Sequence, residues 1–356
     1  MNIDDLLTIA AERLASDLHV RAGSPPYLRI DGDLIPIETA PLGAPDVERM
    51  AFDLMNEEQI RNFKQTNESD FAYSLPGVAR FRVNAFRQRG AVGIAIRRVL
   101  PGSTSFEALG LPASVEALCE ERRGLILVTG MTGSGKTTTT AAMINHINSR
   151  RRCHIVTIED PIEVLHADKL AIVDQREVSI DTADFATALK HVARQDPDVI
   201  FIGEMRDPET VKAALSAAET GHLVISTLHT LDATETINRV IDFFPPHQQM
   251  QARLTLAATL KGVVSQRLLV RADGDGRVPA VEVLVATGRV FDMIVNPDQT
   301  HMIEDVIREG DFYGMQTFDQ HLIELVAAGH VRFDEASAAA TSPHDFSLAI
   351  QQRGIA

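Results

Sequence analysis

The feature that most constrains this chain is a glycine-rich loop. Residues 130–137 read Gly-Met-Thr-Gly-Ser-Gly-Lys-Thr, a complete match to the pattern G-x-x-x-x-G-K-[ST]. A strand-like segment, 124–129, precedes the loop, and a helix-like segment, 138–148, follows it. In this order the backbone N–H groups of the loop and of the helix N-terminus converge on phosphate oxygens. The sequence therefore predicts a site for a nucleoside triphosphate. The alternative is a glycine-rich turn that matches the pattern by chance.

Each side chain of this loop has an expected part in binding. Lys136 is expected to reach the β- and γ-phosphates, and the Thr137 hydroxyl is expected to ligate Mg²⁺. ATP and Mg²⁺ are thus the expected cofactors. The expected nucleotide-binding residues are Gly130, Thr132, Gly133, Ser134, Gly135, Lys136, Thr137 and Thr138.

Carboxylates follow two further strand-like segments, at the edge where open parallel sheets place their ligands. The run Glu-Asp-Pro-Ile-Glu over 159–163 follows one of them, and its proline favours an extended exit that aims Glu163 at a water molecule. Glu204 follows the strand-like segment 199–202, where it can hold Mg²⁺ directly or through water. A solvated, purely structural carboxylate is the alternative for each.

Two histidines flank the strand-like segment 223–227. His222 precedes the segment and His229 follows it. A neutral ring nitrogen at such a position can sense or position a γ-phosphate. The alternative is a histidine that is satisfied by a backbone carbonyl. A zinc pair is not expected, because nothing nearby completes a zinc ligand set.

Arginines are concentrated on strand-like segments near the N-terminus. Alternation places Arg80 and Arg82 on one face of a sheet. Three interpretations stay open: a solvated face, a nucleic-acid patch, or a source of arginines that stabilise the γ-phosphate in the transition state. The arginines of these segments are Arg80, Arg82, Arg87, Arg89, Arg97 and Arg98.

Composition excludes several classes of protein. Hydrophobic residues make up 45% and charged residues 23%, as in ordinary globular proteins. No uncharged apolar run reaches about 18 residues, and the acidic start 1–5 lacks signal-peptide features, so a cytoplasmic protein is expected. A formal charge of -15 and an aromatic content of 5% disfavour nucleic-acid binding. Cys119 and Cys153 are expected to be buried thiols.

The periodicity predicts two domains within an α/β fold class. Residues 1–98 mix helical and short alternating segments, which indicates a small α+β domain with an antiparallel sheet. The run Pro-Gly-Ser-Thr-Ser at 101–105 marks a linker, placed at 99–108. In 109–356, continuous apolar runs alternate with helices, which indicates a parallel sheet covered on both faces. The portion from about 290 is expected to be helical.

Three segments have helical spacing. Helix is expected around 46–63, and Gly329 is expected to end the helix of the C-terminal stripe. The N-terminal stripe consists of Ile3, Leu6, Leu7, Ala10 and Leu14, and the C-terminal stripe of Met315, Phe318, Leu322, Leu325 and Val326.

Four ordered motifs make the chain resemble the secretion ATPases, and among them the PilT/PilU family of type IV pilus twitching-motility (retraction) ATPases. The N-terminal segments Ala-Ser-Asp-Leu-His at 15–19, Pro-Pro at 25–26 and Arg-Phe-Arg-Val-Asn at 80–84 are also similar to that family, so the resemblance covers nearly the whole chain. The four motifs are 130–137, 157–163, 196–207 and 220–229.

The resemblance implies a PAS-like N-terminal domain, a RecA-like P-loop ATPase domain, and a homo-hexameric ring with nucleotide between subunits. It assigns water activation to Glu163 and the Walker B role to Glu204, although the division of labour between the two stays open. It assigns the coupling of nucleotide state to ring shape to His229 and His222. Its arginine-finger positions fall on Arg82 and Arg97.

The implied function is ATP hydrolysis that powers pilus retraction. The implied partners are an inner-membrane platform protein and a paralogous pilus ATPase, but no nucleic acid, and the implied location is the cytoplasmic face of the inner membrane. Extension-type pilus or type II secretion assembly ATPases and a RecA-like nucleic-acid motor are the alternatives. Extension-type relatives carry a further N-terminal domain and a four-cysteine zinc site, for which this chain has neither the length nor the cysteines, so retraction is expected.

The resemblance does not separate the two members of that family. Segment 288–295 departs from the Ala-Ile-Arg-Asn-Leu-Ile-Arg-Glu motif of PilT, and 342–348 is somewhat more similar to PilU.

Overall fold

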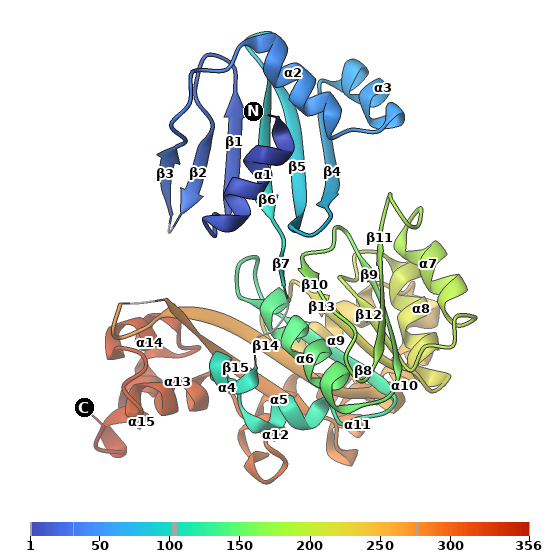
Figure 1. Cartoon of the computed structure of the whole chain (residues 1–356). Helices are drawn as coiled ribbons and strands as arrows, with labels where there is room; N and C mark the ends of the chain where they lie inside the picture. Colours follow the sequence, from blue (N-terminus) through green and yellow to red (C-terminus); the bar gives the residue numbers. More distant parts are fainter. Residues whose placement is uncertain (1, 31, 102–104, 275, 356) are drawn as a thin grey trace. The chain divides into compact units, whose positions relative to one another are not determined.

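The computed structural model describes residues 2–30, 32–101, 105–274 and 276–355. The chain divides into two compact units, Met1–Pro101 and Gly102–Ala356 (Figure 1). Each unit has its own sheet and its own hydrophobic core. The division falls inside the segment 99–108 that the sequence marks as a linker, of which residues 102–104 lie outside the described residues.

The first unit is an antiparallel sheet with helices on one face (Figure 1). Its strand order is β3-β2-β1-β6-β5-β4, and every neighbouring pair runs antiparallel, which confirms the expected sheet. Helices α1 and α2 pack on β1 and β6 and bury the apolar residues of alternating strand positions. The elements are α1 (Ile3–Glu12), β1 (Asp17–Arg21), β2 (Tyr27–Ile30), β3 (Asp33–Pro36), α2 (Ala44–Asp53), α3 (Glu57–Thr66), β4 (Glu68–Leu75), β5 (Ala79–Gln88), β6 (Ala91–Arg98) and β7 (Leu100–Pro101).

Two helical expectations for this unit are wrong in their extent. The expected helix 46–63 is two helices, because Asn56 caps α3 in a reciprocal capping box with Gln59. Leu14 does not belong to the buried stripe of α1, since the helix ends at Glu12 and Leu14 has φ 55° and is 73% exposed.

The second unit is built on a mostly parallel sheet. Its order is β11-β9-β12-β13-β8-β14-β15, and every neighbouring pair is parallel except β14 with β15. The parallel sheet is confirmed, whereas β14 and β15 were not recognised in the sequence. The first elements are α4 (Phe106–Leu109), α5 (Ala113–Leu118), β8 (Gly124–Thr129), α6 (Lys136–Arg150), β9 (His154–Glu159), β10 (Val164–Leu165), β11 (Ile172–Glu177), α7 (Phe185–Val192), β12 (Val199–Ile202), α8 (Pro208–Glu219), β13 (Leu223–Leu228), α9 (Ala233–Asp242), α10 (Pro246–Thr259), β14 (Leu260–Val270) and β15 (Arg277–Val285).

Helices cover both faces of this sheet, as the continuous apolar runs predicted. Leu125 and Leu127 of β8 belong to the core on one face, with residues of α8, α9 and α10. Ile126 and Val128 belong to the core on the other face, with residues of α6. Strand β8 is therefore buried on both sides, and this burial fixes the start of the loop that follows it.

The C-terminal part of this unit is helical. Helices α13 and α15 pack with β14 and β15 around Phe318, Leu322 and Phe346. Met315 is buried but precedes α13, and Gly329 follows the helix with φ 72°. The elements are α11 (Gly288–Val295), η1 (Pro297–Met302), α12 (Ile303–Arg308), η2 (Asp311–Tyr313), α13 (Phe318–Ala327), α14 (Phe333–Ala339) and α15 (Pro343–Gln352).

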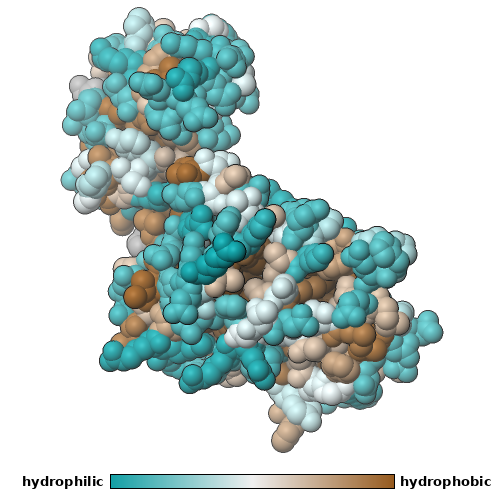
Figure 2. All heavy atoms as spheres, turned by 90° about the vertical axis from the view of Figure 1, so that its right-hand side faces the viewer, coloured by the Kyte–Doolittle hydropathy of each residue, from teal (hydrophilic) through white to brown (hydrophobic). Residues whose placement is uncertain are grey.

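The surface and the cysteines agree with a globular chain. Hydrophilic residues predominate on the face drawn in Figure 2, and hydrophobic residues there form scattered patches. Among the described residues, no helix combines the length and apolar character needed to cross a bilayer. Both cysteines are free thiols; Cys119 is buried, which raises the pKa of its thiol, whereas Cys153 is only half-buried.

Burial at the first helix gives a prediction for stability. Leu6 is fully buried in α1, while Leu14 is 73% exposed. We expect Leu6→Ala to lower the free energy of unfolding of the first unit by about 2–5 kcal/mol and Leu14→Ala to change it by less than about 0.5 kcal/mol. Urea titrations of the full chain followed by circular dichroism measure both. Equal effects of the two variants would contradict the packing described for α1.

Candidate active site

The loop 130–137 requires glycine at two positions where another part of the chain comes very close. Gly130 has φ 141°, and a Cβ there would lie 2.4 Å from the carbonyl oxygen of Gln266 and 2.5 Å from Ser134 Oγ. Gly135 has φ 91°, and a Cβ there would lie 2.6 Å from Gln266 Nε2. Gln266 also accepts a 2.7 Å hydrogen bond from Thr139 Oγ1 of α6. Strand β14 thus braces both ends of the loop, a contribution that sequence reasoning missed.

Lys136 is the first residue of α6 and folds back over this loop. Its Nζ donates to the carbonyl oxygens of Gly130 at 2.7 Å and Met131 at 3.0 Å. Burial lowers the pKa of the Lys136 ammonium, while the charges of Glu204 and Glu163 raise it. The structure therefore brings the loop lysine and both expected carboxylates into one electrostatic neighbourhood.

The groups around the loop fit a phosphate chain. Gly135 is the N-cap of helix α6 and offers no side-chain cap, so the first N–H groups of the helix have no side-chain acceptor. Ser134 Oγ is buried, and within the described part of the chain it has no hydrogen-bond partner. Thr132, Thr137 and Thr138 are exposed. An orphaned hydroxyl, free helix amides and a lysine ammonium are the donors that phosphate oxygens require.

Glu204 follows β12 and is held from two sides. Its Oε1 is paired with the Arg206 guanidinium, and its Oε2 lies 3.2 Å from His229 Nε2. The segment is tied to the end of β13 through Thr227 Oγ1, which donates to the carbonyl oxygen of Gly203 at 2.6 Å. Sequence reasoning missed Arg206, although it stands only two residues after Glu204. Both carboxylate oxygens of Glu204 are engaged.

Glu163 lies at the exit of the carboxylate-rich run after β9. It is exposed, and the run contains a cis peptide bond between Asp160 and Pro161. Glu159, at the end of β9, is 7% exposed and accepts hydrogen bonds from Thr157 Oγ1 at 2.6 Å and Gln175 Nε2 at 3.1 Å.

Burial raises the pKa of Glu159 to about 7. Hydrogen bonds from Thr157, Gln175 and the Glu163 backbone act against this rise. The run 159–163 was recognised in the sequence, but the buried role of its first carboxylate was not.

The two expected histidines lie at opposite edges of the sheet. His229 follows the carboxyl end of β13 and contacts Glu204. His222 precedes the amino end of β13, at the edge away from the loop, because Leu223 pairs with Gly124 and Leu228 with Thr129. His222 Nδ1 lies 3.0 Å from the carbonyl oxygen of Ala217. This contact matches the alternative interpretation of His222, a histidine that is satisfied by a backbone carbonyl. Within one chain, only His229 therefore reaches the site.

The two expected arginine fingers lie in the first unit. Arg82 of β5 and Arg97 of β6 are cross-strand neighbours on the sheet face opposite the buried residues that contact α1 and α2. Arg97 Nε donates to Asp17 Oδ1 at 2.9 Å, and 72% of its side chain is exposed. Both guanidinium groups are thus displayed at a surface of this unit.

A cavity of about 510 Å³ adjoins the first turn of α6. Gly135, Thr138 and Gln266 line it together with His321. Burial lowers the pKa of His321 to about 4, and its Nδ1 accepts a 2.9 Å hydrogen bond from the Val281 N–H. The cavity is wide enough for a small ligand that continues from the loop.

Comparisons with known proteins agree over nearly the whole chain. The family model described as Type II/IV secretion system protein matches residues 1–302. The type IV pilus retraction ATPase PilT of Pseudomonas aeruginosa is 44% identical over 97% of this chain and 100% of its own length. PilU of the same organism, a type IV pilus ATPase, is 40% identical over 99% of this chain and 92% of its own.

Solved structures give the same result. A crystal structure of the pilus retraction motor PilT with bound ADP is 44% identical and has a TM-score of 0.89, covering 97% of this chain and 98% of that one. The ATPase DotB of Legionella pneumophila is 25% identical with a TM-score of 0.75, covering 95% and 94% of the two chains.

The raised pKa of Glu159 gives a pH prediction. Its ordinary value of 4.5 applies to the unfolded chain and about 7 to the folded one, so the unfolded state loses this proton first. The free energy of unfolding therefore falls as pH rises from about 4.5 to about 7. We expect Glu159→Gln to remove this part of the pH dependence. Urea titrations at about pH 5 and pH 7.5 measure it, with the exposed Glu219→Gln as control.

The contrary result is equally clear. If Glu159→Gln and Glu219→Gln changed stability with pH in the same way, Glu159 would titrate normally and would not be desolvated.

Proposed function

Because the chain belongs to the Type II/IV secretion system protein family, we propose that it is an ATP-hydrolysing motor that powers type IV pilus retraction. The observation that carries this proposal is that Lys136 begins a helix without a side-chain cap, where the charges of Glu163 and Glu204 act on its ammonium group. The end-to-end likeness to PilT supports retraction as the work that hydrolysis drives.

The two carboxylates take different parts in the reaction. Arg206 and His229 hold both oxygens of Glu204 in a fixed orientation, and each oxygen keeps a further lone pair for a cation. Glu163 is exposed and free to meet water. It accepts a proton as the water oxygen attacks the γ-phosphorus and the bond to the ADP oxygen breaks.

The loop supplies binding and charge stabilisation. Backbone N–H groups of 130–137 and the Lys136 ammonium hold the β- and γ-phosphates. Thr137 and Glu204 are the residues that would hold Mg²⁺, which neutralises phosphate charge when it is bound. The nucleoside extends into the cavity beside α6, where Thr138 and His321 lie in its wall.

Residues outside this constellation act between copies of the chain. Arg82 and Arg97 reach the γ-phosphate bound by a neighbouring copy in a homo-hexamer, because the first unit displays them at a surface. His229 relays the state of the Glu204 site to the start of α9, and His222 contributes to coupling at the far edge of the sheet. The ring acts at the cytoplasmic face of the inner membrane through a platform protein, with a paralogous pilus ATPase as a further partner.

Two variants and a control test the catalytic assignment. Lys136→Ala should abolish ATP binding, because the phosphate charge loses its main counter-charge. Glu163→Gln should retain ATP binding but lower turnover by about 10²- to 10⁴-fold, since no base then takes the proton. Phosphate release and a fluorescent ATP analogue measure the two steps, with Glu219→Gln as the control. Turnover near that of the wild type in Glu163→Gln would remove Glu163 from the role of base.

A cellular test addresses the work that hydrolysis drives. Cells that lack the protein should keep surface pili but lose twitching, because filaments then assemble without being withdrawn. Electron microscopy shows the pili, and spreading beneath agar measures twitching. The wild-type chain should restore movement, whereas the Lys136→Ala chain should not. Bald cells would point to extension instead.

A further inference from the structure

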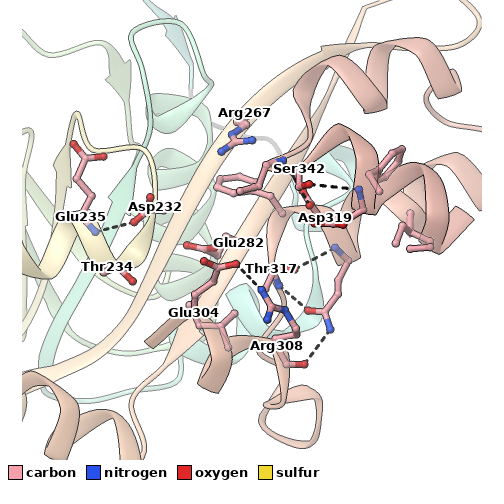
Figure 3. A pocket seen from close by; sticks show the side chains of 18 of the residues that line it. Asp232, Thr234, Glu235, Arg267, Glu282, Glu304, Arg308, Thr317, Asp319 and Ser342 are labelled. Carbon is pink, nitrogen blue, oxygen red and sulfur yellow. Dashed lines mark hydrogen bonds and ion pairs between the residues drawn. The ribbon is translucent and has the colours of Figure 1, made fainter. Parts of the chain in front are cut away.

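A second, larger cavity lies in the second unit and shares none of the loop residues 130–137. It has a volume of about 920 Å³. The start of α9, strands β14 and β15, and helices α12, α13 and α15 form its walls (Figure 3). The proposed ATPase mechanism makes no use of it.

A buried carboxylate faces this cavity. Glu282 of β15 is 5% exposed, and its Oε1 accepts a 2.8 Å hydrogen bond from the Ala233 N–H. Within the described residues, no hydrogen bond or ion pair reaches its other oxygen. Its carboxylate lies beside that of Glu304 in Figure 3. Burial and the neighbouring charges of Asp232 and Glu304 raise the pKa of Glu282 to about 7. A cation that meets the open oxygen favours the charged form of this carboxyl.

The charges around the cavity are not balanced internally. Among the described residues of its wall, Glu304 is the one carboxylate in an ion pair, with Arg308 Nη2 at 2.7 Å. Arg267 forms no ion pair with a described residue, since it donates to the carbonyl oxygen of Ala339 and lies 3.9 Å over the Phe318 ring, although its charge still lowers the pKa of Glu282. The carboxylates are Asp232, Glu235, Glu282, Glu304, Asp319 and Asp345, against the arginines Arg267, Arg308 and Arg353.

Most of the carboxylates without an ion pair accept hydrogen bonds only from neutral backbone N–H groups. Asp232 accepts from the Glu235 N–H, Glu235 from the Leu231 N–H, and Asp319 from the Thr341 N–H. These hydrogen bonds fix the carboxylates in place without neutralising them. The cavity therefore presents preoriented negative charge to an entering cation.

The chemistry of the wall selects the kind of cation. Within the described part of the chain, no group of three or more His, Cys, Asp or Glu side chains is arranged to hold a metal ion. Apolar side chains, among them Ile323, Phe318 and Phe346, line the same cavity. We propose that it binds an organic cation, an ammonium or guanidinium group on a hydrocarbon chain, with Glu282 as the anchor and Phe318 beside the hydrocarbon.

This site is connected to the candidate active site through the start of α9. Ala233, whose N–H is held by Glu282, stands four residues after His229, and His229 contacts Glu204. A cation on Glu282 weakens its hold on the Ala233 N–H and shifts the position of the His229 segment. This coupling rests on the proposed ATPase function, whereas binding of the cation does not.

Calorimetry on the full chain without nucleotide tests binding. The probes are agmatine, as a free amine, and the blocked peptide acetyl-Ala-Arg-Ala-amide, as a basic side chain of a polypeptide. We expect saturable binding of at least one probe, weakened about tenfold or more by Glu282→Gln, because a hydrogen bond to a charged group is lost. Asp345→Asn, at an exposed position of the wall, should weaken binding less, and Glu219→Gln, outside the cavity, should leave it unchanged.

The variants and probes are chosen so that each result supports or overturns the proposed cation site. Glutamine keeps an oxygen for the Ala233 N–H, and Asp345→Asn gives a second reading if Glu282→Gln does not fold. Binding of agmatine alone points to a free amine, and binding of the peptide alone to a basic side chain. No saturable binding of either probe, equal binding by Glu282→Gln and Glu219→Gln, or saturable binding of inorganic phosphate instead would overturn the proposal.

A second readout separates this site from the ATPase proposal. The bound probe should change the ATP turnover of the wild-type chain severalfold and leave that of Glu282→Gln unaffected. Absence of any turnover in the wild type would count against the proposed function, while calorimetric binding would still establish the cation site. Binding without an effect on turnover would refute the coupling alone.

Discussion

The candidate active site depends on backbone N–H groups whose positions are fixed by a buried strand. Strand β8 lies between β13 and β14 and is buried along its whole length, so the loop after it starts from a fixed point. Strand β14 holds that point through a 3.0 Å hydrogen bond between Thr129 Oγ1 and Ser265 Oγ, and it approaches Gly130 and Gly135 too closely for any side chain. The first amides of α6 are thus held in a fixed orientation, as a preorganised phosphate site requires.

The parallel order of the sheet then decides which side chains lie at the same edge as the loop. Strands β9, β12 and β13 end at the same edge as β8, and the residues after them include Glu163, Glu204 and His229. Both carboxylates raise the pKa of the Lys136 ammonium against the effect of its burial. A group of opposite charges at an exposed edge suits a site where a highly charged substrate enters and leaves.

Local patterns in the sequence predicted the parts of the site that depend on local geometry. The loop 130–137, Glu163 and Glu204 each begin within four residues of the end of a strand, so their shared edge could be expected from the chain order alone. Gln266 and Glu282 could not be found this way, because their surroundings come from segments more than a hundred and about fifty residues away, respectively. The start of a new helix after Asn56 could have been predicted from the spacing Asn-x-x-Gln, which is typical of a capping box. The helical spacing of apolar residues across 46–63 favoured a single helix instead.

Hydrogen–deuterium exchange at the loop tests the central claim most directly. With a non-hydrolysable ATP analogue and Mg²⁺, the account predicts slower exchange of the amides in 130–138, because phosphate oxygens accept hydrogen bonds from them. Exchange at the amides near Glu163 and Glu204 should slow as well. Unchanged exchange across 130–138 at a saturating concentration of the analogue would contradict the account.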